Sequence, residues 1–187
     1  MNSYSKDILL LNISRFDHYI ELANNKANWL LTSLFTLLLG VFALIGYSDI
    51  IKNITNGNHI IIHIITFLNI ASFLALIFFN IQAFYYLNFV LNSNLKLHLG
   101  GNSIIFFGDI SNKSFPDFSK KIDELDENRT IEDLKEQVYI LADITNTKHQ
   151  NIIKVNKIIM LRIMPASLVV CFFSCFSKLI SLAICKG

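Results

Sequence analysis

The sequence predicts an all-α integral membrane protein, in which three transmembrane helices continue inward as cytoplasmic helical extensions that form a small helical lobe. Three observations carry this prediction. Apolar residue types make up 53% of the 187 residues, more than in an ordinary soluble domain. Asp, Glu, Lys and Arg are missing from three long stretches of the chain. Gly and Pro are sparse, so few residues interrupt the helical patterns.

The three uncharged stretches are long enough to cross a bilayer as helices. Ala27–Ser48 lacks charge over 22 residues and Asn53–Leu95 over 43. Ile163–Ser177 is the third, and it continues past Lys178, whose ammonium can reach the interface. About 20 helical residues cross the hydrocarbon core, so the predicted spans are 28–48, 60–84 and 159–183. Three buried helices of a soluble core are disfavoured, because the chain has too little other sequence to cover them.

The positive charges predict the orientation of the spans. The 1–27 segment holds Lys6, Arg15 and Lys26, the 49–59 link holds Lys52, and nine Lys or Arg lie between the second and third spans. A basic excess marks the cytoplasmic side. The sequence therefore predicts a cytoplasmic N-terminus, an external link, a cytoplasmic lobe over 85–158 that is the candidate ligand-binding region, and an external tail at 184–187.

Several function classes are excluded by the same composition. The lobe carries ten Asp or Glu against nine basic residues, whereas a nucleic-acid polymer requires one-sided basic charge. Cys171 and Cys175 share a helix face and are interpreted as packing residues. His59 and His63 have no third metal ligand nearby. No phosphate loop or nucleophile motif is present, so we expect no enzyme, no cofactor and no metal site.

The first helix is predicted to be continuous, because neither Gly nor Pro occurs from Asp7 to Leu39. Its first part, within 1–27, is an amphipathic stalk. An apolar stripe keeps steps of three and four throughout, and its members are Leu9, Ile13, Phe16, Ile20, Ala23, Ala27, Leu30, Leu34 and Leu37.

The second helix is expected between Asn58 and Leu99, with an aromatic belt of Phe84, Tyr85, Tyr86 and Phe89 at its inner end. Gly100–Gly101 then ends it, and the β-branched and aromatic run 102–110 is predicted as a strand or an extended loop.

Two further helices are expected before the third span. Pro116 suits the first turn of a short helix over about 117–128. Thr130 to Asp133 resembles a capping box that opens a longer helix. This helix runs into the third span and is expected to kink at Pro165.

The longer helix has an apolar seam of Ile131, Leu134, Val138, Leu141, Ile152, Val155 and Ile159, which two polar residues interrupt. These residues are Thr145 and Lys148. Burying an unpaired ammonium costs several kcal/mol. In one interpretation, Lys148 pairs with a carboxylate of a neighbouring helix or fixes the helix register. In the other, Lys148 and Thr145 meet a negatively charged ligand in a pocket of the lobe.

Other polar and aromatic residues are candidates for the same pocket. A nucleotide requires an aromatic face for its base, amide or hydroxyl groups for hydrogen bonds and a cation for its phosphate. The sequence offers these groups near the first span and after the second helix. For Phe106 and Phe107, packing within the lobe is the alternative role. The candidates are Asn24, Asn25, Lys26, Asn102, Ser103, Phe106 and Phe107.

Three segments resemble the Pycsar effector family, which comprises small bacterial membrane proteins encoded beside a pyrimidine cyclase. They are "ELANNKANWLL" (21–31), "NSIIFFGDI" (102–110) and "DLKEQVYILADITNTKHQNI" (133–152). The family pattern has Ala-Asp-Thr-Lys-Ala before the first span, Ser followed by Phe-Phe-Gly near the second, and Gln…Leu-Ala-x-Ile-x-x-x-Lys before the third. The residues that agree are Lys26, Ser103, Phe106, Phe107, Gly108, Gln137, Ala142, Ile144 and Lys148.

The chain departs from this pattern at four positions. Asn24 and Asn25 stand where Asp and Thr are usual, and Asp109 and His149 stand where His and Tyr are common. Asn24 therefore lacks the carboxylate that the usual Asp would supply.

The resemblance implies an effector of an anti-phage, abortive-infection system. A cyclic nucleotide from a partner cyclase, a cyclic pyrimidine mononucleotide in particular, would activate it to impair the inner membrane, and a homo-oligomer is expected. Together with the seam and the polar and aromatic candidates above, the resemblance gives the predicted ligand-binding residues, which are Asn25, Lys26, Asn102, Ser103, Phe106, Phe107, Gln137, Thr145 and Lys148. The alternative is a ligand-independent, pore-forming or holin-like toxin that a partner protein restrains. Asn69, Asn80 and Gln82 would then join helices of an oligomer.

Overall fold

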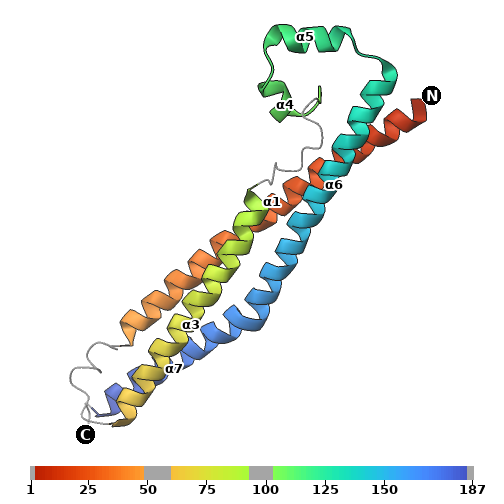
Figure 1. Ribbon diagram of the computed structural model, residues 1–187. Helices are drawn as coiled ribbons and strands as arrows, with labels where there is room; N and C mark the ends of the chain where they lie inside the picture. Colours follow the sequence, from red (N-terminus) through yellow and green to blue (C-terminus); the bar gives the residue numbers. More distant parts are fainter. Residues whose placement is uncertain (1–2, 49–59, 93–102, 185–187) are drawn as a thin grey trace. The chain divides into compact units, whose positions relative to one another are not determined.

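A computed structural model describes residues 3–48, 60–92 and 103–184, and every regular element in these ranges is helical (Figure 1). Three long helices are apolar enough to cross a membrane. The predicted all-helical membrane fold is therefore confirmed. In chain order the elements are α1 (Ser3–Tyr47), α3 (Ile60–Leu91), α4 (Phe107–Ser111), α5 (Phe115–Asp123), α6 (Glu127–Ile158), the π-helix η1 (Ile159–Ile163) and α7 (Met164–Ile184).

The chain divides into two compact units. The first, the lobe unit, comprises residues 1–25 and 89–150, and the second, the membrane unit, comprises residues 26–88 and 151–187. Each of the helices α1, α3 and α6 contributes residues to both units.

The 45-residue helix α1 is continuous, as the absence of Gly and Pro predicts. All nine members of its apolar stripe are buried or half-buried, while the positions between them are mostly exposed. At about 1.5 Å per residue the helix is about 68 Å long, more than twice the hydrocarbon thickness of a bilayer.

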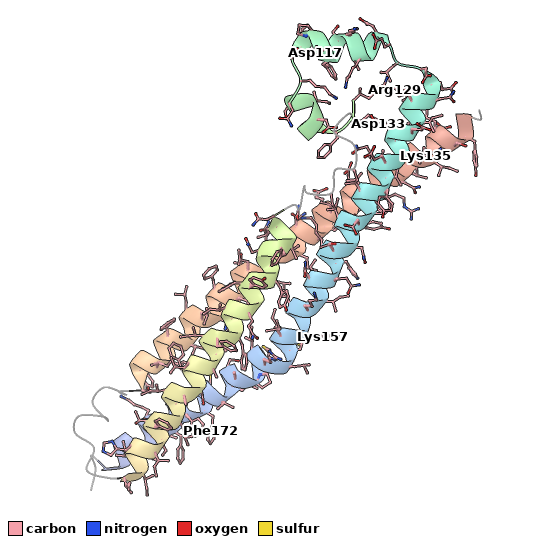
Figure 2. All side chains as sticks on the ribbon, viewed as in Figure 1. Asp117, Arg129, Asp133, Lys135, Lys157 and Phe172 are labelled. Carbon is pink, nitrogen blue, oxygen red and sulfur yellow. The ribbon has the colours of Figure 1, made fainter. Side chains whose placement is uncertain are left out.

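Aromatic stacking and a polar contact join the helices of the membrane unit. The rings of Phe35 and Phe84 stack at 4.9 Å, which joins α1 to α3, and Asn69 donates a 3.0 Å hydrogen bond to Ser174, which joins α3 to α7. Large apolar side chains also project outward along this unit, as around the labelled Phe172 in Figure 2, which is 63% exposed. Exposed apolar surface of this extent is suited to contact with lipid chains.

The helix boundaries in the lobe unit differ from three predictions. The run predicted as a strand or extended loop is non-helical only over 103–106, within the described residues, and Phe107 begins α4. Helix α5 ends at Asp123 rather than about 128, although Pro116 lies in its first turn as predicted. The predicted capping box at Thr130 is wrong: Asp126 Oδ1 accepts from the Arg129 amide at 2.7 Å, so α6 begins at Glu127, four residues earlier than predicted.

Two expectations for the long helices are refined. Helix α3 ends at Leu91, so the predicted continuation towards Leu99 is wrong, and residues 93–102 lie outside the described residues. The irregularity expected at Pro165 takes the form of η1, where the Met164 amide bonds to the Ile159 carbonyl. Pro165 lacks an amide N–H, and the helix inserts its extra residue directly before that position. The ribbon changes direction there (Figure 1).

Candidate ligand-binding site

The seam of α6 is buried along its length, including the two polar positions. Thr145 is half-buried and Lys148 is 2% exposed. The Thr145 hydroxyl donates to the Leu141 carbonyl of its own helix at 2.7 Å, so this side chain is satisfied locally. Lys148 reaches across to other helices instead, which makes it the first feature of the site.

The Lys148 ammonium contacts two neutral oxygen atoms within the lobe unit. Its Nζ donates to Asn24 Oδ1 of α1 at 2.8 Å and to the Val90 carbonyl of α3. Val90 lies in the last turn of α3, where carbonyls have no partner within the helix and where the helix dipole favours a cation. Among the described residues, no carboxylate forms an ion pair with Lys148. The charge is therefore solvated by amide and carbonyl dipoles alone.

Burial lowers the pKa of the Lys148 ammonium from its ordinary value of 10.5, because an enclosed site disfavours the charged form. Lys148 lies before the predicted 159–183 span. The contacts of Lys148 bear on both interpretations of the seam. The first interpretation expects a carboxylate partner, and none lies among the described surroundings of Lys148. The second expects a negatively charged ligand, and the observed contacts are those of a buried cation with neutral partners and no counter-anion.

We expect Asn24→Asp to change the pH dependence of stability. In the wild type the folded state binds fewer protons than the unfolded state between the lowered pKa of Lys148 and 10.5, so the free energy of unfolding rises with pH across that window. The carboxylate introduced at position 24 would favour the charged ammonium and raise its pKa, which removes the rise. Melting temperatures in detergent from pH 7 to 10.5 measure the slope.

Asn25→Asp is the matched control, because Asn25 is the exposed neighbour and the substitution changes the net charge equally. It should keep the wild-type slope. Equal slopes for Asn24→Asp and the wild type would contradict the contact between Asn24 and Lys148.

Ser103 is the centre of a second polar cluster, beside α6. Its Oγ accepts from the amides of Ile105 at 3.1 Å and Phe106 at 2.9 Å, and from Gln137 Nε2 at 3.3 Å. Its carbonyl accepts from Lys113 Nζ at 2.7 Å. Ser103 and Gln137 are both buried, so the structure brings together two of the residues that the family resemblance implies.

Two carboxylates complete this cluster by holding the backbone before α4. Asp109 Oδ2 accepts from the Ser103 amide at 2.6 Å, and Asp133 Oδ2 of α6 accepts from the Ile104 amide at 2.9 Å. Asp133 is labelled in Figure 2 on the part of α6 near this segment. The hydrogen bonds fix the path of residues 103–109, so the cluster shapes the lobe.

Gly108 leaves room for the ring of Phe106. A Cβ atom at Gly108 would lie 2.6 Å from Phe106 Cε1, which is closer than van der Waals contact. The Phe-Phe-Gly motif therefore has a packing function at its glycine. The Phe107 backbone starts α4, and its side chain lies outside the described ones.

The predicted ligand-binding residues do not form a single cluster. Gln137 and Lys148 are eleven positions apart on α6, or about 16 Å along its axis. Asn25 and Lys26 are exposed, and Lys26 belongs to the membrane unit. Asn102 lies outside the described residues.

Sequence reasoning missed several residues of these two clusters. Asn24 was among the candidates for the pocket, but its hydrogen bond to Lys148 was not predicted, although Asn24 lies three positions before the buried Ala27 on one helix face. Asp133 precedes Gln137 by four positions and could have been found in the same way. Val90 contributes a backbone carbonyl, for which the sequence carries no signal. The described residues contain no cluster of three or more His, Cys, Asp or Glu that could hold a metal.

The chain was compared with protein families, curated proteins and solved structures. The family profile described as the Pycsar effector protein domain matches residues 8–176, which is most of the chain. No curated protein and no solved structure matched in these comparisons. The matched domain is a membrane effector and not a known enzyme family, in agreement with the three helices apolar enough to span a bilayer. The chain therefore belongs to the Pycsar effector family, the membrane effectors of the Pycsar anti-phage system.

Proposed function

We propose that this effector is activated by a cyclic mononucleotide with a pyrimidine base, made by a partner cyclase, and that activation impairs the bacterial inner membrane. The observation that supports this most directly is the buried Lys148 ammonium with only neutral partners among the described residues. The phosphodiester of a cyclic nucleotide carries one negative charge and would supply the missing counter-anion.

The proposal places the lobe in the cytoplasm, where a cyclase product is available. The basic excess on the N-terminal and central segments supports a cytoplasmic N-terminus and a multi-pass arrangement in the inner membrane. Thr145 lies one turn before Lys148 and would contribute its hydroxyl. Ser103 and Gln137 would contribute indirectly, by holding the lobe in the shape that binds the ligand, because they are already hydrogen-bonded to each other.

Ligand binding would require a change in the packing of the lobe unit. Lys148 is 2% exposed, so a phosphate reaches it only when Asn24 or the end of α3 moves away. The ligand would then exchange a neutral partner of Lys148 for an anionic one and favour the opened packing over the closed one. A ligand shifts such an equilibrium only by binding one state better than the other. The opened packing would promote self-association of the effector in the bilayer.

Isothermal titration calorimetry on detergent-solubilised protein tests the proposal, with cyclic UMP and cyclic CMP as probes. Lys148→Met is expected to weaken binding at least about tenfold, because a charge-assisted hydrogen bond contributes about 1.5–3 kcal/mol. Lys135→Met is the matched control, since Lys135 is exposed on the same helix. The same variants, expressed with a pyrimidine cyclase, report whether growth inhibition follows binding.

Two results would remove the proposal: no heat with either nucleotide for the wild type, or equal affinity of the Lys148→Met and wild-type proteins. Circular dichroism of each variant separates lost binding from lost folding.

The ligand-independent toxin remains the second candidate. The amides assigned to its oligomer contacts have partners within the chain: Asn69 bonds Ser174, Gln82 accepts from Arg162, and Asn80 Nδ2 donates to Leu76. Asn80 Oδ1 is buried without a hydrogen-bond partner among the described residues, and the side chain is 1% exposed. This unsatisfied oxygen favours the second candidate only through a repacking of the helices that exposes it to a second copy of the chain. Growth inhibition by the effector expressed without any cyclase would support this candidate over the first.

A further inference from the structure

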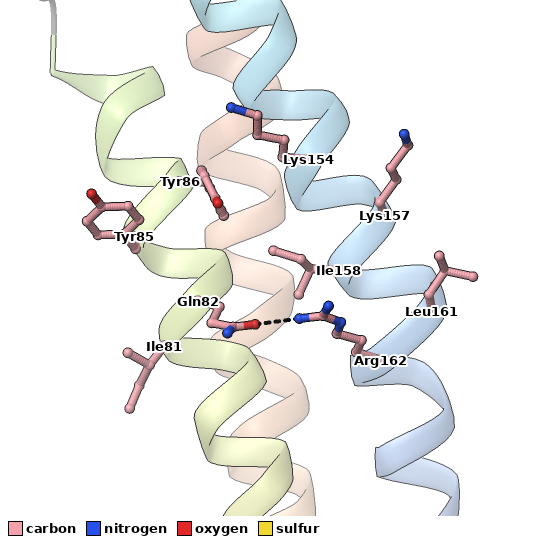
Figure 3. A pocket seen from close by; sticks show the side chains of 9 residues that line it. All are labelled: Ile81, Gln82, Tyr85, Tyr86, Lys154, Lys157, Ile158, Leu161 and Arg162. Atoms are coloured by element: carbon pink, nitrogen blue, oxygen red, sulfur yellow. Dashed lines mark hydrogen bonds between the residues drawn. The ribbon is translucent and has the colours of Figure 1, made fainter.

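A basic groove lies within the membrane unit, between the inner part of α3 and the segment formed by the end of α6 and η1 (Figure 3). Its volume is about 660 Å³. Three cations line it, and they are Lys154, Lys157 and Arg162. Tyr85 and Tyr86 lie on the opposite wall, on α3.

The cations of the groove have no counter-anion in the described part of their surroundings. None of the described residues that line the groove is Asp or Glu. The sequence contains neither residue from 50 to 108 or from 144 to 187, so both walls belong to acid-free segments. Arg162 Nη1 donates to the neutral Gln82 Oε1 at 2.9 Å, and Lys154 Nζ lies 5.4 Å from the centre of the Tyr86 ring. These contacts orient two of the cations without neutralising them.

The groove coincides with the end of the charged part of the third long helix. Arg162 is the last charged residue before the apolar stretch Ile163–Ser177. Lys154 lies about 12 Å further from this stretch along the helix axis. Tyr85 and Tyr86 belong to the aromatic belt that marks a membrane interface. Exposed Leu161, at 74%, adjoins the cations. The groove thus combines cationic, aromatic and apolar surface over the helical turns that lead into the apolar stretch.

The π-helix contributes to this arrangement. Arg162 lies within η1, where the extra residue changes the direction of the side chains relative to a regular α-helix. Figure 3 shows the Arg162 guanidinium turned across the groove towards Gln82 of α3. The single hydrogen bond to Gln82 leaves other guanidinium N–H groups able to donate to a phosphate.

We propose that this groove binds the headgroup of an anionic phospholipid. The phosphodiester would lie between Lys154, Lys157 and Arg162, the tyrosines would border the headgroup, and the acyl chains would continue along the exposed apolar side of η1 and α7. Basic pockets between transmembrane helices bind anionic headgroups in this way. The site is distinct from Lys148, which belongs to the lobe unit.

A cyclic nucleotide carries the same phosphodiester, but three features favour the lipid. The groove is open and exposed rather than enclosed, its cations stand at the charged edge of an apolar span, and apolar surface follows directly below them. A soluble mononucleotide has no chains to cover that surface.

Native mass spectrometry of the full-length protein in a neutral detergent tests the proposal, with phosphatidylglycerol and phosphatidylcholine of identical acyl chains as probes. We expect phosphatidylglycerol to bind more tightly. Lys157→Gln should weaken its binding about fivefold, and Lys154→Gln/Lys157→Gln/Arg162→Gln about a hundredfold, from about 1 kcal/mol for each cation near the membrane surface. Phosphatidylcholine binding should stay unchanged in both variants.

The matched controls remove equal charge from exposed positions of the lobe unit. They are Lys135→Gln for the single variant and Lys120→Gln/Arg129→Gln/Lys135→Gln for the triple variant. Both should bind phosphatidylglycerol as the wild type does. Lys157 is exposed, so its single variant tests the site even if the triple variant does not fold.

Three results would overturn the proposal. The first is equal binding of the two lipids, and the second is an equal loss in Lys157→Gln and Lys135→Gln, which would indicate a general charge effect. The third is displacement of one bound phosphatidylglycerol by stoichiometric cyclic UMP or cyclic CMP, which would assign the groove to the nucleotide.

Discussion

Lys148→Glu is expected to prevent the effector from accumulating in the membrane. The substitution puts a carboxylate against the Val90 carbonyl, so one acceptor faces another in a site where the native side chain is 2% exposed. An uncompensated buried charge costs about 3–5 kcal/mol, a large fraction of the roughly 5–15 kcal/mol that stabilises a typical domain. Immunoblots of membrane fractions and melting in detergent measure the loss.

A second substitution tests the geometry behind this expectation. Asn24→Lys returns an ammonium to the same contact from α1, so Asn24→Lys/Lys148→Glu should recover part of the accumulation that Lys148→Glu loses. Lys135→Glu, at an exposed position of the same helix, should accumulate normally. Wild-type accumulation and melting of Lys148→Glu would show that this side chain is not enclosed in the native protein.

Ser103→Ala is expected to be the second most damaging change. The Ser103 hydroxyl oxygen accepts from two backbone amides and from Gln137, and alanine leaves these donors without their partner in a mostly buried cluster. Each donor so orphaned costs about 1–3 kcal/mol, so we expect a loss of about 3 kcal/mol or more in the free energy of unfolding. Denaturant titration followed by circular dichroism measures it.

Ser111→Ala is the control for this prediction, because Ser111 is exposed and its hydroxyl donates only to the Gly108 carbonyl one turn earlier. Its effect should stay below about 0.5 kcal/mol, as for ordinary surface positions. Similar losses in the two variants would show that the Ser103 cluster does not hold the segment before α4.

Periodicity in the sequence was sufficient to predict the long helices. The steps of three and four on α1 correspond to its buried stripe, and the α6 seam remains buried through Thr145 and Lys148. Periodicity predicts these helices because apolar residues at steps of three and four lie on one face of a helix, and this face packs against the neighbouring helices.

The helix starts were less predictable. Asp126 and Thr130 are both good capping residues, and only the backbone path decides which of them binds the first free amides.

The candidate site was predicted only in part. The sequence identified Lys148 as an anomaly, since an ammonium on an apolar seam conflicts with its surroundings. Asn24 was a candidate for the same pocket, but its pairing with Lys148 was not predicted, because the two residues are 124 positions apart in the chain. Val90 was not predicted at all, because it contributes only its backbone carbonyl. The separation of Ser103 and Gln137 from Lys148 was also missed, because a set of motif residues does not reveal distances along a helix.

The division of α1, α3 and α6 between two units has a consequence for recombination among relatives of this protein. Neither unit is a continuous stretch of chain, because the boundaries fall near positions 25, 88 and 150, within three helices. A chimaera that exchanges one whole unit must therefore be spliced at three intrahelical points in register. A single crossover near position 25 would mix the parents within the lobe unit, one near 150 within the membrane unit, and one near 88 within both. The two units are therefore expected to be inherited together.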